Sequence, residues 1–294
     1  MNKFIQYLRL IRIHQWVKNI FIFLPIFFDK KIFELEYLLP TLLVFFVFSF
    51  TSSIIYCIND LRDIDVDRIH PIKSKRPLAS GNVTKKEAII IIFGLIISII
   101  SLILFGNINL NAIIIISTYF IVNLLYTFYL KKIAIVDVAI IALGFTLRVL
   151  SGGLAVDVYV SHWIIIMTFL ITLFLAFAKR RDDCVILLET GKKMRGNTER
   201  YSIAFIDTTM SILAAITIVA YLQYCLDPMT IARYNTDKIY ITFIFVLLAI
   251  LRYLQLSIVD NKSGNPTKLL MKDKFVISMV GLYVLTFVLL IYVL

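Results

Sequence analysis

Four aspartates lie within eight residues, directly after an apolar run long enough to cross a membrane. On a helix, at about 100° per residue, Asn59, Asp60, Asp63 and Asp67 share one face, whereas Asp65 points elsewhere. Asp60 and Asp63 would then be roughly 5–6 Å apart at Cβ, and such close carboxylates repel each other unless a cation lies between them. Oxygen ligands of this kind suit Mg²⁺, which commonly binds one or two carboxylates and the oxygens of a substrate phosphate. These four residues are therefore a predicted Mg²⁺ site, with a solvated helix end as the alternative.

A cationic segment follows the aspartates. Pro71 and Pro77 end any helix there, so the segment is predicted to be a loop. Its basic side chains are Arg68, His70, Lys73, Lys75 and Arg76. Lysine supplies point charge to phosphate oxygens and arginine a forked donor, so this loop beside a metal site favours a Mg-diphosphate substrate. A basic loop that only sets membrane topology is the alternative.

A second charged cluster ends a later apolar run. It consists of Lys179, Arg180, Arg181, Asp182 and Asp183. The two carboxylates could hold a second metal ion, or the three cations could bind phosphate while the carboxylates balance them. The cations outnumber the acids and come first, which favours phosphate binding.

Arg148 lies in the middle of another apolar run, where an arginine is costly and by default a functional candidate. Gly144, Ser151, Gly152 and Ala155 share its helical face, and small residues permit close helix packing. Arg148 is therefore predicted to face the protein interior, either at a functional site or in a buried ion pair with an acid from another helix.

Polar side chains also gather where the first apolar run begins. Gln15, Lys18 and Asn19 lie so close to the apolar boundary that they are predicted to face into the bundle. Tyr126 and Lys131, at the end of the fourth run, could extend the same cavity. A tyrosine at that depth is more often part of the interfacial aromatic belt.

These residues must be positioned by membrane helices. Hydrophobic residues make up 60% of the 294 residues, more than a water-soluble domain hides. We expect nine apolar spans of roughly 17–22 residues, and runs without alternation favour helices over a barrel. The sequence predicts an all-α integral membrane protein of nine transmembrane helices, with residues 1–294 as one membrane-embedded domain.

Charge distribution predicts the topology. Of the 30 Lys and Arg residues, 25 lie in five segments that would share one side with the N-terminus, and four lie on the other side. Such a bias places the N-terminus and the large polar loops in the cytoplasm. The net charge of +11 therefore requires no nucleic-acid partner. The three cysteines have no paired spacing and are predicted to be free thiols.

At these residues the chain resembles the UbiA family of intramembrane prenyltransferases, whose first motif, Asn-Asp-x-x-Asp-x-x-x-Asp, is met at residues 59–67. Within the family it is similar to the decaprenyl-phosphate phosphoribosyltransferase branch. The segments that carry this similarity are 15–19, 67–77, 147–153, 178–180 and 264–266. The chain differs from the branch at Ile13, where proline is usual, and at 181–183, where an aromatic-small-Glu run is usual.

The resemblance implies a Mg²⁺-dependent glycosyltransferase that transfers a 5-phosphoribosyl group from phosphoribosyl pyrophosphate to a polyprenyl phosphate, releasing pyrophosphate. It implies Asp60 and Asp63 as catalytic carboxylates in the metal site. The residues expected at the substrates are Gln15, Lys18, Arg68, Lys73, Lys75, Arg76, Tyr126, Lys131, Arg148, Lys179, Arg180, Asp182 and Asp183. The expected location is a bacterial inner membrane with the active site facing the cytoplasm, and a homo-oligomer is compatible with this interpretation.

Two alternative functions use the same features. A typical family member ionises a prenyl diphosphate on the metal site and alkylates an aromatic or quinone-precursor acceptor. The surplus of polar and cationic residues near the site favours the sugar donor. A transporter for an anionic solute would also use a mid-span arginine, but its expected pair of broken spans has only one candidate, at Gly152 and Gly153.

Overall fold

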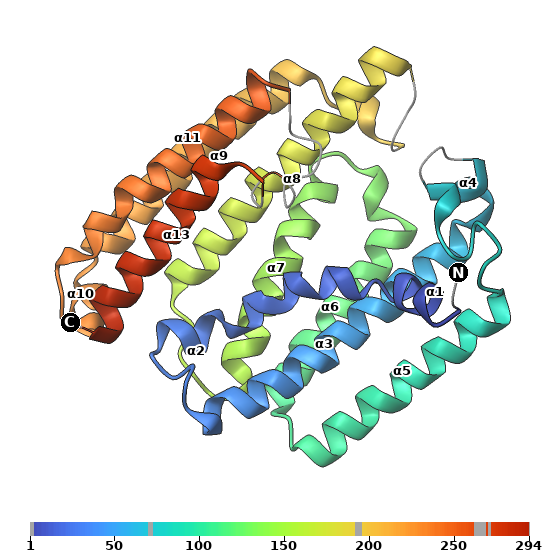
Figure 1. The fold of residues 1–294 in the computed structure, drawn as a ribbon, viewed down its shortest axis with the longest axis horizontal. Helices are drawn as coiled ribbons and strands as arrows, with labels where there is room; N and C mark the ends of the chain where they lie inside the picture. The colour runs from blue at the N-terminus through green and yellow to red at the C-terminus, as the bar shows by residue number, and fades with distance from the viewer. Residues whose placement is uncertain (1–2, 70–72, 192–195, 262–268, 270–271, 294) are drawn as a thin grey trace. The chain divides into compact units, whose positions relative to one another are not determined.

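The computed structural model describes residues 3–69, 73–191, 196–261, 269 and 272–293, and the regular elements in these ranges are all helical (Figure 1). Eight helical segments are long and apolar enough to cross a membrane, and a bent pair near the N-terminus makes up to nine. The prediction of an all-α membrane protein is thereby confirmed, and the predicted number of nine spans is reached when the bent pair counts as one. The eight segments are α3 (Leu35–Arg62), α5 (Lys85–Gly106), α6 (Leu110–Phe128), α7 (Val136–Ala155), α8 (His162–Thr190), α9 (Ile203–Leu226), Lys238–Ile258, which ends in α11 (Phe243–Ile258), and Lys274–Tyr292, which begins with α13 (Lys274–Val288).

The bent pair has two parts, and the second part contains two short helices; all of them are blue in Figure 1. They are α1 (Lys3–Leu10), the 3₁₀ helix η1 (Ile13–Phe23) and α2 (Leu24–Phe28), with a bend of 43° between α1 and the rest. Arg12 stands at the bend in the left-handed conformation, with φ of 55°. A non-glycine residue seldom adopts this conformation, so the chain direction changes sharply there.

The chain divides into two compact units, each described separately. Unit 1 comprises Met1–Phe128 and Gly144–Val160, and unit 2 comprises Tyr129–Leu143 and Ser161–Leu294. Helix α7 contributes its first part to unit 2 and its second part to unit 1. That residues 1–294 act as one transferase domain stays a prediction.

In unit 1, α3 packs against η1, α5 and α6. Val44, Val47 and Phe48 of α3 lie in a buried apolar cluster with Tyr119 of α6. The second part of α7 approaches η1 so closely that a Cβ added at Gly152 would lie 1.8 Å from the carbonyl oxygen of Ile22. Only glycine fits there, which confirms that the small-residue face of α7 permits close packing.

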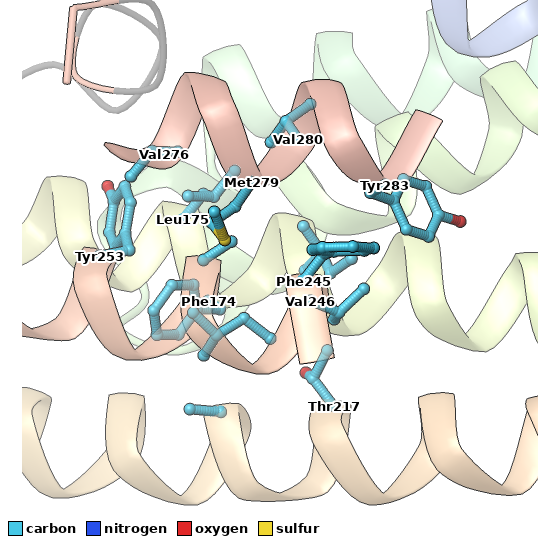
Figure 2. A pocket seen from close by; sticks show the side chains of 14 residues that line it. Phe174, Leu175, Thr217, Phe245, Val246, Tyr253, Val276, Met279, Val280 and Tyr283 are labelled. Carbon is cyan, nitrogen blue, oxygen red and sulfur yellow. The ribbon is translucent and has the colours of Figure 1, made fainter. Parts of the chain in front are cut away.

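In unit 2, α9 packs against both α8 and α11, and α11 packs against α13, in yellow to red in Figure 1. These four helices line an open apolar pocket of about 240 Å³ (Figure 2). Phe174, Met279 and Val280 line it, together with the rings of Tyr253 and Tyr283. The size and apolar lining suit part of a hydrocarbon chain, since a cavity of about 150 Å³ already binds benzene.

Polar caps set the start of several spans. Thr84 and Glu87 form a reciprocal capping box at the start of α5, and the side chain of Ser202 caps α9. Asp273 caps α13 by accepting from the Val276 N–H and also pairs with Arg252 of α11. The three cysteines are buried free thiols, as predicted.

Candidate active site

The acidic motif lies at a helix break in unit 1. Helix α3 ends at Arg62, Asp63 has a non-helical conformation, and α4 continues from Ile64 to Ile69. The prediction of one continuous helical face through Asp67 is therefore wrong, because the chain turns at Asp63. The backbone N–H of Asp67 still donates to the carbonyl of Asp63, at 2.8 Å, which keeps the two parts of the motif close.

Two carboxylates of the motif nevertheless converge on one cation. Nη1 of Arg76 lies 3.0 Å from Oδ1 of Asp60 and 2.6 Å from Oδ2 of Asp67. Arg12, at the bend of the first span, adds a second guanidinium 2.6 Å from Oδ1 of Asp60. Both carboxylates are almost fully buried, whereas Arg76 keeps 26% of its side chain exposed. The site thus concentrates negative charge in the interior beside cations that water still reaches.

The chemistry of these donors fits a magnesium ion. Within the described residues, no group of three or more His, Cys, Asp or Glu side chains is arranged to hold a metal. Mg²⁺ does not need such a group, since it usually keeps one or two carboxylates and takes substrate phosphate oxygens and water as its other ligands. Asp60 and Asp67 supply two buried carboxylates that already face a shared positive charge.

The other members of the motif and its loop differ in burial. Asn59 and Asp63 are partly buried, while the Asp65 side chain is 91% exposed and, within the described part of the chain, pairs with Arg68 alone, at 3.4 Å. The prediction that Asp65 points away from the motif is therefore confirmed. Lys73 is partly buried and Lys75 is exposed, both in the short 3₁₀ helix η2 (Lys73–Lys75). His70 and the segment 264–266 lie outside the described residues.

Arg148 is buried in unit 1 among neutral groups. Its Nε donates to Oδ1 of Asn19 at 2.7 Å, Nη1 to the carbonyl of Gly144 at 2.6 Å, and Nη2 to the Tyr119 hydroxyl at 3.0 Å. The rings of Phe48, Tyr119 and Phe145 surround its guanidinium, with centroids at 4.8, 4.8 and 5.1 Å. Its interior orientation was predicted correctly.

The sequence allowed a buried ion pair for Arg148, but Arg148 forms none with the described residues. Among the described residues no carboxylate lies within ion-pair distance of its guanidinium, whose hydrogen-bond acceptors are an amide, a carbonyl and a hydroxyl. Cation–π contacts and these dipoles solvate the charge without neutralising it.

The first span connects this arginine to α3. Asn19 donates to Ser49 at 2.8 Å and Trp16 to Ser53 at 3.1 Å, which fixes one side of η1 on α3. Asn19 faces the bundle as predicted. Arg12 and Tyr119 were missing from the predicted site. A cation at the start of an apolar span could have indicated Arg12, but an aromatic residue within an apolar run gives no signal for Tyr119.

The second charged cluster, in unit 2, has a closed geometry. Arg180 pairs with Asp137 at 2.7 Å and with Asp183 at 3.1 Å, and all three side chains are buried. The other oxygen of Asp137 accepts from the Tyr201 hydroxyl at 2.6 Å. Burial first, and this hydrogen bond second, raise the pKa of the Tyr201 hydroxyl, which therefore stays a donor. Sequence reasoning did not find the Asp137–Arg180 pair.

The remaining cations of this cluster diverge. Arg181 turns inward to Asp207 and Asn261, each at 2.7 Å. Lys179 pairs with Asp182 at 3.3 Å and keeps 38% of its side chain exposed. Phosphate binding by Lys179 and Arg180 stays a prediction.

Tyr126 and Lys131 complete the predicted residues. Tyr126 lies near the end of α6 in unit 1, and Lys131 lies in the 3₁₀ helix η3 (Leu130–Lys132) in unit 2. Both are partly buried. Their role at a substrate also stays a prediction.

Known proteins resemble this chain over nearly its whole length. The model of the UbiA prenyltransferase family matches residues 29–280. The chain belongs to the UbiA prenyltransferase family. The decaprenyl-phosphate phosphoribosyltransferase of Mycolicibacterium smegmatis is 30% identical, over 91% of this chain and 86% of its own. The protein of that name from Corynebacterium glutamicum is 28% identical, over 91% and 81%.

The fold agrees with solved family members. A UbiA homologue from Archaeoglobus fulgidus, solved with DMAPP and Mg²⁺, superposes with a TM-score of 0.68 and 21% identity over 98% of this chain and all of that one. Together with the relatives, this makes the protein an integral membrane enzyme of the transferase class.

Proposed function

We propose that the protein transfers a 5-phosphoribosyl group from phosphoribosyl pyrophosphate to a polyprenyl phosphate in a Mg²⁺-dependent reaction. The observation that carries this proposal is the convergence of two buried carboxylates, Asp60 and Asp67, on a shared cation beside a basic loop. That arrangement suits a Mg-diphosphate donor. The similarity to enzymes named decaprenyl-phosphate phosphoribosyltransferase, over about nine-tenths of the chain, supports phosphoribosyl pyrophosphate as that donor.

The proposed reaction forms one bond and breaks one. A phosphate oxygen of the lipid bonds to the anomeric carbon of the ribose, while the bond from that carbon to the diphosphate oxygen breaks and pyrophosphate leaves with the electron pair. The attacking phosphate is already an anion at pH 7, so no strong base is needed. Mg²⁺, when bound, would neutralise charge that develops on the leaving diphosphate.

The side chains of unit 1 would bind the metal ion and the phosphate groups of the donor. Asp60 and Asp67 would hold the metal ion, and Asn59 and Asp63, from the same motif, would complete its surroundings. Arg76, with Lys73 and Lys75 of the following loop, would bind phosphate oxygens of the donor; Arg68 is a further candidate at the loop's start. Arg76 is best placed for this role, since it already contacts both carboxylates.

The location follows from the same proposal. The bias of Lys and Arg supports a cytoplasmic N-terminus and acidic motif, and the membrane we propose is a bacterial inner membrane. A water-soluble donor would reach the motif from that side, and the lipid acceptor would approach from the bilayer.

The alternative is a prenyl diphosphate donor with an aromatic or quinone-precursor acceptor. It is favoured by one observation, the fold shared with a homologue that was solved with DMAPP and Mg²⁺. Either donor is a Mg-diphosphate, so the acidic motif suits both. The loop cations Lys73 and Lys75 exceed what a prenyl diphosphate requires, which favours the sugar donor.

The test is a transfer assay with the purified protein in detergent. Phosphoribosyl pyrophosphate labelled in the ribose is incubated with polyprenyl phosphate and Mg²⁺. We expect label to move into the organic phase only when lipid and metal are both present, with EDTA as the metal control. Absence of transfer, while the Mycolicibacterium smegmatis enzyme works alongside, would contradict the proposal. Activity with a prenyl diphosphate and an aromatic acceptor would then establish the alternative.

A further inference from the structure

The first span has an unusual winding that gives its three sides different environments. Segment η1 is a 3₁₀ helix over 11 residues, whereas 3₁₀ runs are usually limited to three or four. At three residues per turn, every third side chain lies directly above the previous one. The side chains of η1 therefore form three straight columns, and the structure gives each column its own surroundings.

The first column faces the protein. Trp16 and Asn19 donate to serines of α3, and Ile22 is fully buried against Gly152 of α7. The second column begins with the exposed His14 and continues with two apolar, exposed side chains: Val17 is 51% and Ile20 is 53% accessible. In a segment that belongs to a membrane span, we expect these exposed apolar side chains to face lipid.

The third column carries Gln15 and Lys18, both partly buried. With a rise of about 2.0 Å per residue, Lys18 lies about 6 Å deeper along the span than Gln15. In an α-helix the same two residues would be rotated by about 60° relative to each other and would still be neighbours on one face. The 3₁₀ winding places Lys18 directly above Gln15, so both polar groups lie on one side, between the α3-facing and the lipid-facing columns.

Lys18 carries a charge without a counter-ion in the described part of the chain. The structure gives its ammonium group no ion pair or hydrogen bond there, and the charges within electrostatic range include two further cations, Arg148 and Arg12. Arg12 is balanced by Asp60, but Arg148 has only neutral acceptors. Asn19, the residue next to Lys18, holds the guanidinium of Arg148 at 2.7 Å. Uncompensated positive charge at this depth is costly and is relieved by an anion.

We propose that Lys18 binds the phosphate of the lipid acceptor, with Arg148 as the positioning residue behind it and Gln15 as a neighbouring donor. This inference rests on the proposed function and assigns one of its two phosphate-bearing substrates. The lipid-facing column beside Lys18 decides between the substrates, because a phosphate on a hydrocarbon tail can lie at an apolar, lipid-exposed surface. A sugar phosphate is wholly hydrophilic and finds cations in the loop at Lys73 and Lys75.

The test separates the Michaelis constants of the two substrates. Lys18→Met removes the charge and keeps the length of the side chain. Lys86→Met, at an exposed position at the start of α5, makes the same chemical change as a matched control. Polyprenyl phosphate is varied as its mole fraction in detergent micelles. Loss of one charge-assisted hydrogen bond predicts a rise of about tenfold to a hundredfold in KM for this lipid.

The pattern across variants decides the assignment. We expect Lys18→Met to change KM for phosphoribosyl pyrophosphate by less than about twofold, Lys18→Arg to retain most of the lipid affinity, and Lys86→Met to resemble the wild type. A rise confined to phosphoribosyl pyrophosphate, or no change in either constant, would overturn the proposal. Lys18→Gln, with the same measurements, replaces Lys18→Met if the methionine variant does not elute as a folded protein.

A direct binding measurement keeps this inference separate from the proposed function. Displacement of a fluorescent polyprenyl phosphate by unlabelled polyprenyl phosphate, and by uncharged polyprenol, requires no turnover. The wild type should prefer the phosphate, and Lys18→Met should lose most of that preference. An equal preference in both proteins overturns the role of Lys18, whereas a wild type that binds the lipid phosphate but transfers no ribose contradicts only the proposed function.

Discussion

The two charged clusters of this protein contain the same residue types but differ in whether water reaches their arginines. In unit 1, Asp60 and Asp67 share the guanidinium of Arg76, which remains 26% exposed. In unit 2, Arg180 is 1% exposed and lies between Asp137 and Asp183. The first arrangement places buried carboxylates beside a cation that water and a ligand can reach. The second encloses its arginine between two buried carboxylates, while water reaches Lys179, 3.9 Å from Asp183.

The difference teaches that charge alone does not identify a site in a membrane protein. A buried arginine flanked by two carboxylates is a compensated group whose partners leave little for a ligand. Carboxylates that share one accessible cation can exchange that partner for a metal ion or a substrate. We therefore expect the unit 1 cluster to control activity and the unit 2 cluster to control stability.

The largest effect should come from Asp60→Asn. The change removes the buried charge that is proposed to hold the metal ion and keeps the size of the side chain. Transfer activity should therefore fall by roughly a hundredfold or more, because a metal ion contributes several kcal/mol to the transition state. The measurement is the labelled-ribose assay with Mg²⁺ varied. Asp65→Asn, the same change at the exposed position of the same motif, is the control and should remain active. Equal activities of the two variants would contradict the prediction that the unit 1 cluster controls activity.

The next effect is on stability. Arg180→Met leaves Asp137 and Asp183 without their buried cation and should lower the free energy of unfolding by about 3–5 kcal/mol. Arg76→Met should cost less than Arg180→Met, since Arg76 is partly exposed and Arg12 still pairs with Asp60, although the buried Asp67 loses its cation. Unfolding in detergent with increasing denaturant measures both. A larger loss for Arg76→Met would reverse the two roles.

A smaller effect should come from Gly152→Ala, which tests how unit 1 is assembled around its polar groups. The new Cβ would meet the carbonyl of Ile22 and push η1 away from α7, at a cost of about 1–3 kcal/mol. Gly94→Ala in α5 is the control, because nothing lies within 4 Å of its added Cβ. That variant should be stabilised by about 0.5–1 kcal/mol through its helix propensity. If Gly152→Ala proved equally harmless, the close approach would not hold η1 in place.

The smallest effect concerns an ion pair outside both clusters, Asp273 with Arg252. Hydrogen bonding to Arg252, and then to the Val276 N–H, lowers the pKa of the Asp273 carboxyl. Its stabilising contribution is therefore complete above the unfolded-state pKa of about 3.9, and it is lost as the pH falls through the lower folded-state pKa.

Asp273→Asn keeps a helix cap but removes the charge, so it should cost less than about 1 kcal/mol at pH 7. Unfolding midpoints of the wild type and the variant, compared from pH 7 downwards, should converge below pH 3.9. A difference that grows in acid would contradict this assignment. The contribution of this partly exposed pair to the free energy of unfolding can then be compared with the larger contribution expected of the buried Arg180 pairs.

Several features follow from the sequence because they depend on local patterns. Long apolar runs specify membrane helices wherever they occur, so the nine spans were predictable. The small residues around Arg148 indicated its interior orientation, because a helix fixes which neighbours share a face. The spacing of the acidic motif indicated that its carboxylates would gather and that Asp65 would not join them.

Other features were decided only by the tertiary structure. Asp137 and Arg180 are 43 residues apart, and their pairing depends on how two helices are rotated and how deep each lies. The same holds for Arg12 and Asp60, 48 residues apart. Hydropathy and helical period give each helix a buried side but not its rotation or depth relative to its neighbours.

The winding of the first span shows the same limit. Nothing in the residues 13–23 distinguishes a 3₁₀ helix from an α-helix, since both bury apolar groups at a similar period. The structure selects the tighter form where Trp16 and Asn19 bond to α3 and Ile22 meets Gly152. The sequence by itself therefore determined which residues could do chemistry and that they lie in a membrane. Packing between helices decided which charges are enclosed and which remain available, because only neighbouring helices can supply or withhold a partner.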